Sequence, residues 1–496
     1  MQSTSEVHCL LLSLKNSLAP INRIPPEVLS LIPDHFDQCI SDQDLITLTH
    51  VCRRWRNTLT YRSSLWTRLN LLNVDKTRTY IQRSRLSPLQ VYLINERHVV
   101  YLEDAFSLFI PHTHRLKTLI VHADVLPAAL NRFRCPTPLL KELGIDLHCQ
   151  PAAILDSALF GGDLASLHEL HLKGNITNLP WKTLANLRVF SFAPRRPVQV
   201  TQLLDFFDFA PLLQTIKFTN SFESTSDAPP ERIVHLRNIN KLSILAEDHP
   251  PPTLLNHLYI PTGASVHLQL SSYGEGSPLL DYFPETPPNL KNLTHVTAVN
   301  LCFHLRNKHV RLSGPSGSLH LDIYWGVQGI DSYTMDRRIL HSRGLPILST
   351  TQKLTVSEYG HLHQNNPKRC PVFKALTSAT DLRTLTLTGC NNLPFILALD
   401  PEKNPSKSIL CPKLEELILY IRTRDRFHTE HLNSMAGNRA RRGVGLSSVT
   451  VFGLGELVPG EGVLRLREHV RRVEYRVEDE PPTWDYVPGE DGDESN

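Results

Sequence analysis

Near the start of the chain, apolar residues recur at the spacing of short amphipathic helices. The pair Pro25-Pro26 favours a helix start, because proline fixes φ near a helical value and has no N–H to donate. The apolar residues that follow at i, i+1, i+3 and i+4 are Val28, Leu29, Leu31 and Ile32. This spacing gathers them on one broad stripe and predicts a first helix beginning at the proline pair.

A second helical stretch has a clearer start. Ser41 precedes Asp44 by three residues, as in a capping box. Beyond it the apolar positions advance by 3, 4, 3 and 4 residues, through Leu45, Leu48, Cys52, Trp55 and Leu59. Arginines occupy positions off that stripe. The pattern therefore predicts a helix with one sharply defined apolar face.

Several rare residues in this stretch recur in the order and spacing of a known family. They are an Ile-Pro opening at 24–25, an Asp-Leu start at 44–45, the run VCRRW at 51–55 and a closing Leu-Trp at 65–66. The stretch resembles the F-box, although the family usually opens with Leu-Pro and has fewer residues between 34 and 43. The resemblance implies a three-helix module at residues 21–70 that docks on a Skp-family adaptor protein and, through it, on a cullin.

By that resemblance, the adaptor-binding residues are the main apolar positions of the module. They are Ile24, Pro25, Val28, Leu29, Ile32, Leu45, Leu48, Val51, Cys52, Trp55, Leu65 and Trp66. About forty residues are too few to bury this many leucines and tryptophans completely, so some of them must pack on another surface. The alternative is an ordinary helical hairpin that packs on its own domain.

Farther along, a block of the type L-x-x-L-x-L returns at the pitch of leucine-rich repeats. Its first positions lie 24, 27, 20, 26 and 26 residues apart, at Leu116, Leu140, Leu167, Leu187, Leu213 and Ile239. Clear copies start at Leu382 and Leu414, and weaker ones lie at 265–270, 296–301, 318–324 and 353–356. A repeat of this length holds one short strand and a returning helix or turn. Right-handed crossovers would stack these strands in parallel.

The predicted fold class is α/β, with a short N-terminal helical F-box followed by a curved leucine-rich-repeat-like solenoid of parallel strands with returning helices. Its irregular repeat lengths resemble the degenerate leucine-rich-repeat F-box proteins abundant in fungi. We expect a lead-in helix at 1–20, the F-box at 21–70, the divergent solenoid at 72–477 and an acidic disordered tail at 478–496. Four insertions rich in proline, glycine or polar residues, at 223–232, 271–289, 359–371 and 400–412, are expected to be loops.

Composition and charge indicate which classes of binding partner, and which cellular location, to expect. The 496 residues are 41% hydrophobic and 20% charged, with a net charge of +3, which gives no reason to expect a nucleic-acid or membrane partner. The nine cysteines form no C-x-x-C pair, so reduced thiols are expected. No apolar run approaches the roughly 18 residues of a membrane span. We therefore expect a cytoplasmic and/or nuclear location.

Candidate catalytic and metal-binding motifs are incomplete. The run His168-Glu-Leu-His171 is one residue short of H-E-x-x-H, and in a strand its two histidines would point to opposite faces. The glycine-rich pieces at 314–318 and 452–457 match no phosphate loop or nucleophile elbow and are interpreted as turns. Two histidine pairs, 112/114 and 361/363, have no Cys or carboxylate at ligand spacing. We expect no catalytic residue, metal site or cofactor.

A basic cluster between 422 and 442 has two interpretations. It comprises Arg422, Arg424, Arg426, Arg439, Arg441 and Arg442. These guanidinium groups would suit an acidic or phosphorylated target through bidentate pairs. A solvated face is the simpler interpretation and is the one favoured here.

Three functional hypotheses follow. The first is a non-catalytic substrate-recognition subunit of a Skp/cullin/F-box type E3 ubiquitin ligase, which binds the adaptor through the F-box and a target protein through the repeat arc. The second is a non-degradative F-box scaffold or a ligand sensor that binds protein or small molecule through the repeats. The third, an enzyme with its active site among the repeats, lacks any recognisable motif. The identity of the substrate, and whether its recognition needs phosphorylation or a small ligand, cannot be predicted from these patterns.

Overall fold

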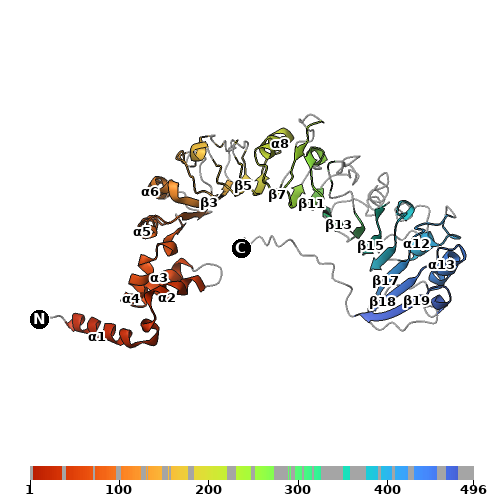
Figure 1. The fold of residues 1–496 in the computed structure, drawn as a ribbon, viewed down its shortest axis with the longest axis horizontal. Helices are drawn as coiled ribbons and strands as arrows, with labels where there is room; N and C mark the ends of the chain where they lie inside the picture. The colour runs from red at the N-terminus through yellow and green to blue at the C-terminus, as the bar shows by residue number, and fades with distance from the viewer. Residues whose placement is uncertain are drawn as a thin grey trace. The chain divides into compact units, whose positions relative to one another are not determined.

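The computed structural model has a mixed α/β architecture with helices at the N-terminal end and parallel strands beyond them (Figure 1). The chain divides into two compact units, residues 1–196 with 208–212, and residues 197–207 with 213–496. The described residues are 4–35, 41–70, 73–95, 102–123, 130, 132–147, 155, 158–162, 164–176, 182, 184–219, 231–246, 252–272, 289, 291, 296–303, 307–314, 318–325, 350–357, 376–388, 392–404, 408–422, 429–454 and 465–478.

The first unit opens with short helices and 3₁₀ turns. In chain order they are α1 (Thr4–Leu18), η1 (Pro20–Arg23), α2 (Pro26–Leu31), η2 (Ile32–His35), α3 (Asp42–His50), α4 (Arg53–Tyr61) and η3 (Ser63–Trp66). As predicted, α2 follows Pro25. Ser41 is the N-cap of α3, where its hydroxyl oxygen accepts from the backbone N–H of Asp44 at 3.1 Å.

The second predicted helix is in fact two helices. α3 ends at His50 and α4 begins at Arg53, because Cys52 has an extended backbone, with φ −162° and ψ 174°. Arg56 reaches back from α4 and donates to the carbonyl of Thr49 near the end of α3, at 3.1 Å. The apolar stripe survives the break, because the two helices pack against each other as a hairpin and both contribute to one core.

Six parallel strands follow in the first unit, paired in chain order. They are β1 (Arg68–Asn70), β2 (Leu89–Asn95), β3 (Leu116–Ala123), β4 (Glu142–Leu147), β5 (Glu169–Gly174) and β6 (Val189–Pro194). Between them lie α5 (Val74–Ser84), α6 (Leu102–Phe109), η5 (Ile110–Arg115) and η6 (Leu159–Gly162). Strands β3 to β6 fall on predicted leucine blocks, so the sequence pattern located them correctly.

One face of these strands forms the core of the first unit. Alternate residues such as Leu143, Ile145, Leu170 and Leu172 are buried, as the period-2 pattern of a strand requires. Beside them, phenylalanine rings from successive connections make edge or tilted contacts. Phe133 lies 5.3 Å from Phe106, 5.9 Å from Phe109 and 6.0 Å from Phe160, measured between ring centroids. Polar side chains such as Glu142, Glu169 and His171 lie on the opposite face of the strands.

The second unit also contains a mainly parallel sheet. Its paired strands, in spatial order, are β7 (Thr215–Thr219), β9 (Lys241–Ala246), β11 (Ser265–Ser272), β14 (Ser318–Trp325), β13 (Asn307–Ser313), β12 (Ala298–Phe303), β15 (Lys353–Ser357), β16 (Thr384–Thr388), β17 (Glu416–Arg422), β18 (Ser448–Leu454) and β19 (Arg472–Glu478). A separate parallel pair joins β8 (Val234–His235) to β10 (Leu258–Tyr259). The helical segments are α8 (Val200–Asp208), α9 (Pro252–Leu255), α12 (Leu393–Leu399), α13 (Thr429–Arg441) and η11 (Leu466–Glu468).

The predicted regular succession of parallel strands is wrong between 298 and 325. There β12, β13 and β14 form an antiparallel meander, so β14 rather than β12 pairs with β11. Only three residues separate β12 from β13, and four separate β13 from β14. A parallel crossover needs a dozen or more residues, whereas an antiparallel hairpin needs only a few.

Two further expectations change with the structure. Residues 452–454, interpreted as part of a turn, lie within β18. The tail expected at 478–496 is outside the described residues apart from Glu478, which ends β19. The expected insertions at 223–232, 271–289 and 359–371 are also mostly outside them, whereas the described parts of 400–412 are turns and irregular chain, as expected. None of the helices in the described ranges has both the length and the apolar character needed to cross a bilayer.

Candidate functional site

The helices before β1 enclose a small apolar core. Leu29 of α2 and Trp55 and Leu59 of α4 are buried. Packed around them and partly buried are Ile24, Ile32, Leu48, Cys52 and Leu65. Sequence reasoning had assigned most of these side chains to adaptor contact, but in this chain they first serve to hold the helices together.

A polar residue that sequence reasoning missed supports this core. The carboxamide oxygen of Asn22 accepts a hydrogen bond from the indole N–H of Trp55 at 3.0 Å, and the thiol of Cys52 lies 3.8 Å from the same oxygen. Asn22 also donates to the carbonyl of Asn16 near the end of α1, at 2.7 Å. A buried indole N–H needs such a partner. Asn22 therefore connects α1 to the core through side-chain bonds that apolar spacing cannot predict.

The predicted adaptor-binding residues divide by burial into three groups. The buried ones are Leu29, Leu45, Trp55 and Trp66, and the partly buried ones are Ile24, Ile32, Leu48, Cys52 and Leu65. Pro25, Val28 and Val51 are exposed. Val28 is 49% exposed and Val51 51%, as is Leu31 at 47%, which was not among the predicted contacts. These exposed positions are accessible to a partner as the chain stands, and adaptor contact by the whole set stays a prediction.

Ion pairs and backbone contacts brace the same helices at their edge. Arg62, which follows α4, donates to the backbone carbonyl of Ser30 and forms an ion pair with Asp34 at 2.6 Å. Arg54 of α4 donates to the carbonyl of Ile24. These bonds tie α4 to both ends of α2. Arg54, which lies off the apolar stripe, thus has a structural partner here.

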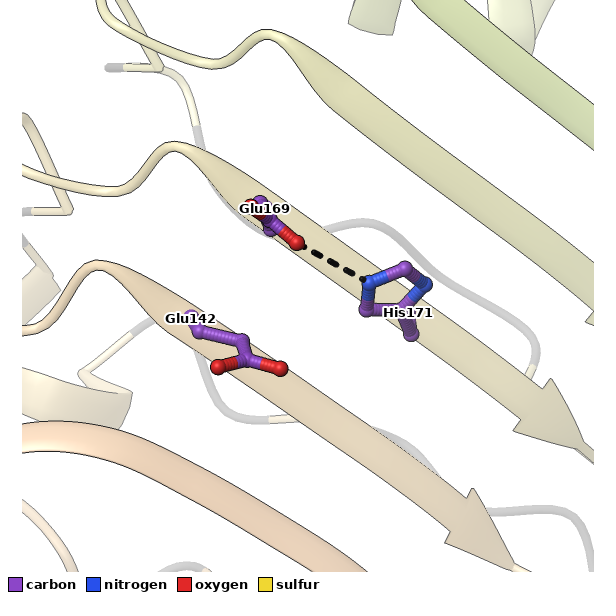
Figure 2. A group of neighbouring side chains, drawn as sticks. All are labelled: Glu142, Glu169 and His171. Atoms are coloured by element: carbon purple, nitrogen blue, oxygen red, sulfur yellow. Dashed lines mark ion pairs between the residues drawn. The ribbon is translucent and has the colours of Figure 1, made fainter. Parts of the chain in front are cut away.

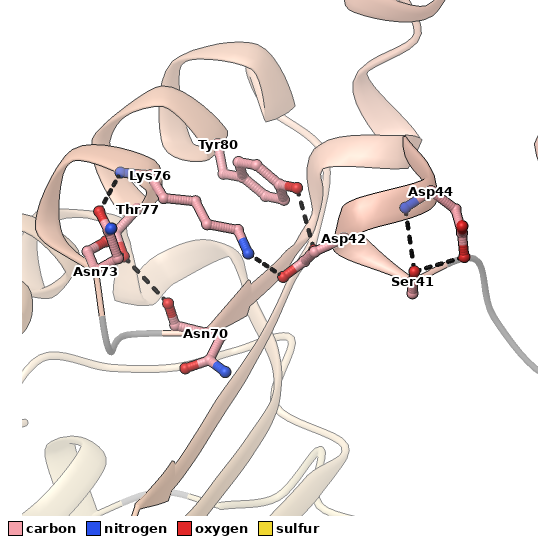
Figure 3. Close-up of polar contacts among 8 residues, drawn as sticks. All are labelled: Ser41, Asp42, Asp44, Asn70, Asn73, Lys76, Thr77 and Tyr80. Carbon is pink, nitrogen blue, oxygen red and sulfur yellow. Dashed lines mark hydrogen bonds and ion pairs between the residues drawn. The ribbon is translucent and has the colours of Figure 1, made fainter. Parts of the chain in front are cut away.

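A polar network joins the start of α3 to α5 (Figure 3). The Asp42 carboxylate accepts from the ammonium of Lys76 and from the hydroxyl of Tyr80, the latter at 3.1 Å. Asn73 caps α5 by accepting from the backbone N–H of Lys76 at 2.9 Å. Asp42 and Tyr80 are 38 residues apart. The network therefore fixes α3 against α5, the first helix after residues 21–70.

Tyr80 is the central side chain of that junction. It is buried, and its ring makes an edge contact with Trp66 at 5.0 Å between centroids. Burial raises the pKa of Tyr80 well above its usual range, and the nearby Asp42 carboxylate raises it further. On the other side, the Arg83 guanidinium lies 4.3 Å from the Trp66 ring centroid. The closing Leu-Trp of the helical region is thus packed into the start of the strand region.

Of the basic cluster expected between 422 and 442, Arg424, Arg426 and the side chain of Arg422 lie outside the described residues, and the described members have different surroundings. Arg439 is fully buried and donates at 2.9 Å to the backbone carbonyls of Leu410 and Cys411. Arg442 is exposed and pairs with Glu402 at 2.7 Å. The sequence held a signal for this burial, because Arg439 lies four residues after the buried Met435, on the same face of α13 as Leu432.

The described histidine pairs lie at β5 and in the 3₁₀ turn η5. The His168 ring contacts the carbonyl of Ser166 at 2.7 Å and precedes β5, while His171 lies within β5. His112 and His114 are 6.5 Å apart between ring centroids, and burial lowers the pKa of His112. The pair at 361/363 is outside the described residues. Neither described pair forms a ligand set by itself.

Comparison with known families supports the identity of the helical region. Residues 21–72 match the family model described as F-box-like. No curated protein matches the chain. The chain therefore contains an F-box-like domain, which covers α2, α3 and α4, and such domains generally bind Skp-type adaptors.

Proposed function

We propose that this chain is the substrate-recognition subunit of a Skp/cullin/F-box type E3 ubiquitin ligase. The observation that carries the proposal is the F-box-like domain at 21–72, whose small core leaves apolar side chains at the surface. In this proposal the domain binds a Skp-family adaptor, and the adaptor connects it to a cullin. The chain itself is non-catalytic, and it promotes ubiquitin transfer by raising the effective concentration of target lysines near the ubiquitin-carrying enzyme.

The strand region is the target-binding part in this proposal. We take residues 72–477 as a divergent leucine-rich-repeat-like solenoid, with the antiparallel meander at β12 to β14 as an interruption. Parallel pairing in chain order from β1 to β6 supports that assignment, as does the alternation of buried with partly buried or exposed positions in β5 and β6. The polar face of the strands would contact the target protein, in the cytoplasm and/or the nucleus.

Adaptor binding is tested by substitutions at the exposed apolar positions, because these side chains do not belong to the buried core. The triple variant Val28→Asp, Leu31→Asp, Val51→Asp is expected to weaken binding of a recombinant Skp-family adaptor by about thirtyfold or more, since buried interface contacts of this kind contribute about 2 kcal/mol or more. Affinity is measured by isothermal titration calorimetry on the full chain.

The matched control changes exposed leucines outside the domain. Leu86 is 86% exposed and Leu139 is 45% exposed, so Leu86→Asp with Leu139→Asp introduces the same chemistry elsewhere. This control is expected to bind the adaptor as the wild type does. If the triple variant kept its wild-type circular dichroism and also bound the adaptor with wild-type affinity, the proposed docking surface would be wrong.

A second experiment separates a substrate receptor from a non-degradative scaffold. The intact protein and the triple variant are purified from cells with their bound partners, which are identified by mass spectrometry. Partners that bind both forms, but accumulate in cells that carry only the triple variant, are targets of degradation. Partners whose cellular levels never change would favour the scaffold or sensor instead.

A further inference from the structure

Three side chains with metal-ligating atoms converge on two neighbouring strands of the first unit. Glu142 extends from β4, and Glu169 and His171 extend from β5 (Figure 2). The parallel register places Glu142 beside Glu169 and Gly144 beside His171. One ligand atom from each of the three side chains lies within 4.8 Å of the other two.

Neighbouring residues orient the side chains of Glu142, Glu169 and His171. The Thr118 hydroxyl of β3 donates to one carboxylate oxygen of Glu142 at 3.1 Å and leaves its other oxygen available. A Glu169 oxygen lies 3.7 Å from Nε2 of His171. Because Gly144 has no side chain, nothing projects from β4 between Glu142 and the His171 ring. The His171 and Glu169 side chains are 42% and 49% exposed, so an ion can reach them from solvent.

A threonine–glutamate contact in the second unit shows which features distinguish the group around Glu142. Thr384 of β16 donates to a Glu416 oxygen of β17 at 3.2 Å, which repeats the Thr118–Glu142 contact on adjacent parallel strands. The next strand, β18, places Ser448 beside Glu416. A threonine–glutamate contact is therefore a feature of the strand pattern, whereas a second carboxylate and an imidazole occur beside Glu142.

We propose that Glu142, Glu169 and His171 bind a divalent transition-metal ion, with Zn²⁺ as the best fit. An imidazole nitrogen with two carboxylate oxygens is a ligand set that Zn²⁺ accepts, whereas Mg²⁺ and Ca²⁺ prefer oxygen ligands alone. Zinc bonds of about 2.0–2.2 Å at tetrahedral angles place ligand atoms roughly 3.3–3.6 Å apart. The 3.7 Å separation of Glu169 and His171 is close to that spacing.

Charge supports the same assignment. Two neighbouring carboxylates repel each other, and a cation between them removes that repulsion. The ion would have three protein ligands and an open position toward solvent, with Thr118 fixing the orientation of Glu142 from the second layer. This metal site goes beyond the proposed function and does not depend on it.

The test titrates Zn²⁺ into the full-length protein by isothermal titration calorimetry, in a buffer that does not chelate metals and after alkylation of the thiols. The wild type is expected to show one tight binding step that is absent from His171→Gln and from Glu169→Gln. Thr118→Val, which removes only the outer hydrogen bond, is expected to weaken that step by about 10- to 100-fold.

Glu416→Gln is the matched control, because it alters the corresponding threonine–glutamate contact where no imidazole is present. It is expected to keep the wild-type step. Persistence of the step in both His171→Gln and Glu169→Gln would overturn the proposal, as would its loss in Glu416→Gln. Equal binding of Mg²⁺ in place of Zn²⁺ would overturn the choice of metal. His171 and Glu169 are about half exposed, and Thr118→Val nearly keeps the volume of a buried side chain, so circular dichroism is expected to match the wild type throughout.

Discussion

The F-box-like helices and the C-terminal region around α13 bury their side chains in different ways. Among the helices, three residues form the buried core, and the apolar side chains around them are only partly covered. Around α13, Leu432, Met435 and Ala436 are fully buried, and even the guanidinium of Arg439 is enclosed. In the helical region, by contrast, the Arg62 guanidinium forms a partly exposed ion pair with Asp34.

The difference follows from what each region packs against. α13 packs against α12 and η11, and its Arg439 reaches the carbonyls of Leu410 and Cys411, so several elements supply the surface that it covers. Short helices have no such surface, and a core of this size cannot cover all of their apolar side chains. The helical region is therefore the part of the chain whose stability should respond most to a binding partner.

The largest effect is expected at the buried cation. Arg439→Ala removes the donor to the carbonyls of Leu410 and Cys411 and leaves a cavity, so unfolding of this region should become easier by about 3–5 kcal/mol. The measurement is hydrogen exchange of the α13 amides in the full chain. The exposed Arg442→Ala, which breaks only the ion pair with Glu402, should change stability by less than about 1 kcal/mol. Equal losses of stability in these two variants would contradict the conclusion that the buried Arg439 stabilises the α13 region more than a surface ion pair does.

A substitution in the helical core should reduce stability less than Arg439→Ala does, and adaptor binding should restore the lost stability. Leu29→Ala is expected to reduce the stability of this region by about 3 kcal/mol, because Leu29 is fully buried between α2 and α4. Exchange of the α4 amides measures the loss, with the exposed Val28→Ala as the control. Saturating adaptor is expected to restore protection in α4 and to leave α13 unchanged. Protection of α13 by the adaptor would contradict the comparison.

The smallest effect concerns pH. Burial raises the pKa of the Cys411 thiol to about 12. The folded state therefore keeps its proton while the unfolded state loses it, so the stabilising contribution is complete below the usual thiol pKa and falls as pH rises toward 12. Relative to Cys411→Ala, the wild type should lose up to about 1.4 kcal/mol of folding stability per pH unit above pH 9. Chemical denaturation at several pH values measures this difference, and parallel curves for the two proteins would refute it.

Sequence patterns located much of this fold because strands and helices have different periods. Blocks such as Leu167-Leu170-Leu172 and Leu414-Leu417-Leu419 fall on β5 and β17, since alternate apolar residues must face one side of a sheet. The family match at 21–72 also agrees with the residues that resembled an F-box. The meander at β12 to β14 was missed, because the leucine pattern of a strand is the same in parallel and antiparallel pairs.

Within the candidate adaptor-binding region, periodicity found the apolar residues but not their roles. Leu29 and Val28 are neighbours in the sequence and both are apolar, yet one is fully buried and the other is half exposed. Which of them is available to a partner depends on how α2 packs against α4. The support from Asn22 and the junction between Asp42 and Tyr80 depend on contacts between residues 33 and 38 positions apart, respectively.

By itself, the sequence determined the type of many elements and which face of them is apolar, because both depend on residues only a few positions apart. The tertiary structure alone decided which distant residues become neighbours. Glu142 and Glu169 are 27 positions apart and meet only through the register of β4 and β5. Arg439, which in the sequence belongs to a basic cluster, is enclosed only because α13 packs over the carbonyls of Leu410 and Cys411. Strand register and helix packing depend on contacts between residues far apart in the sequence, so no local pattern of residues encodes them.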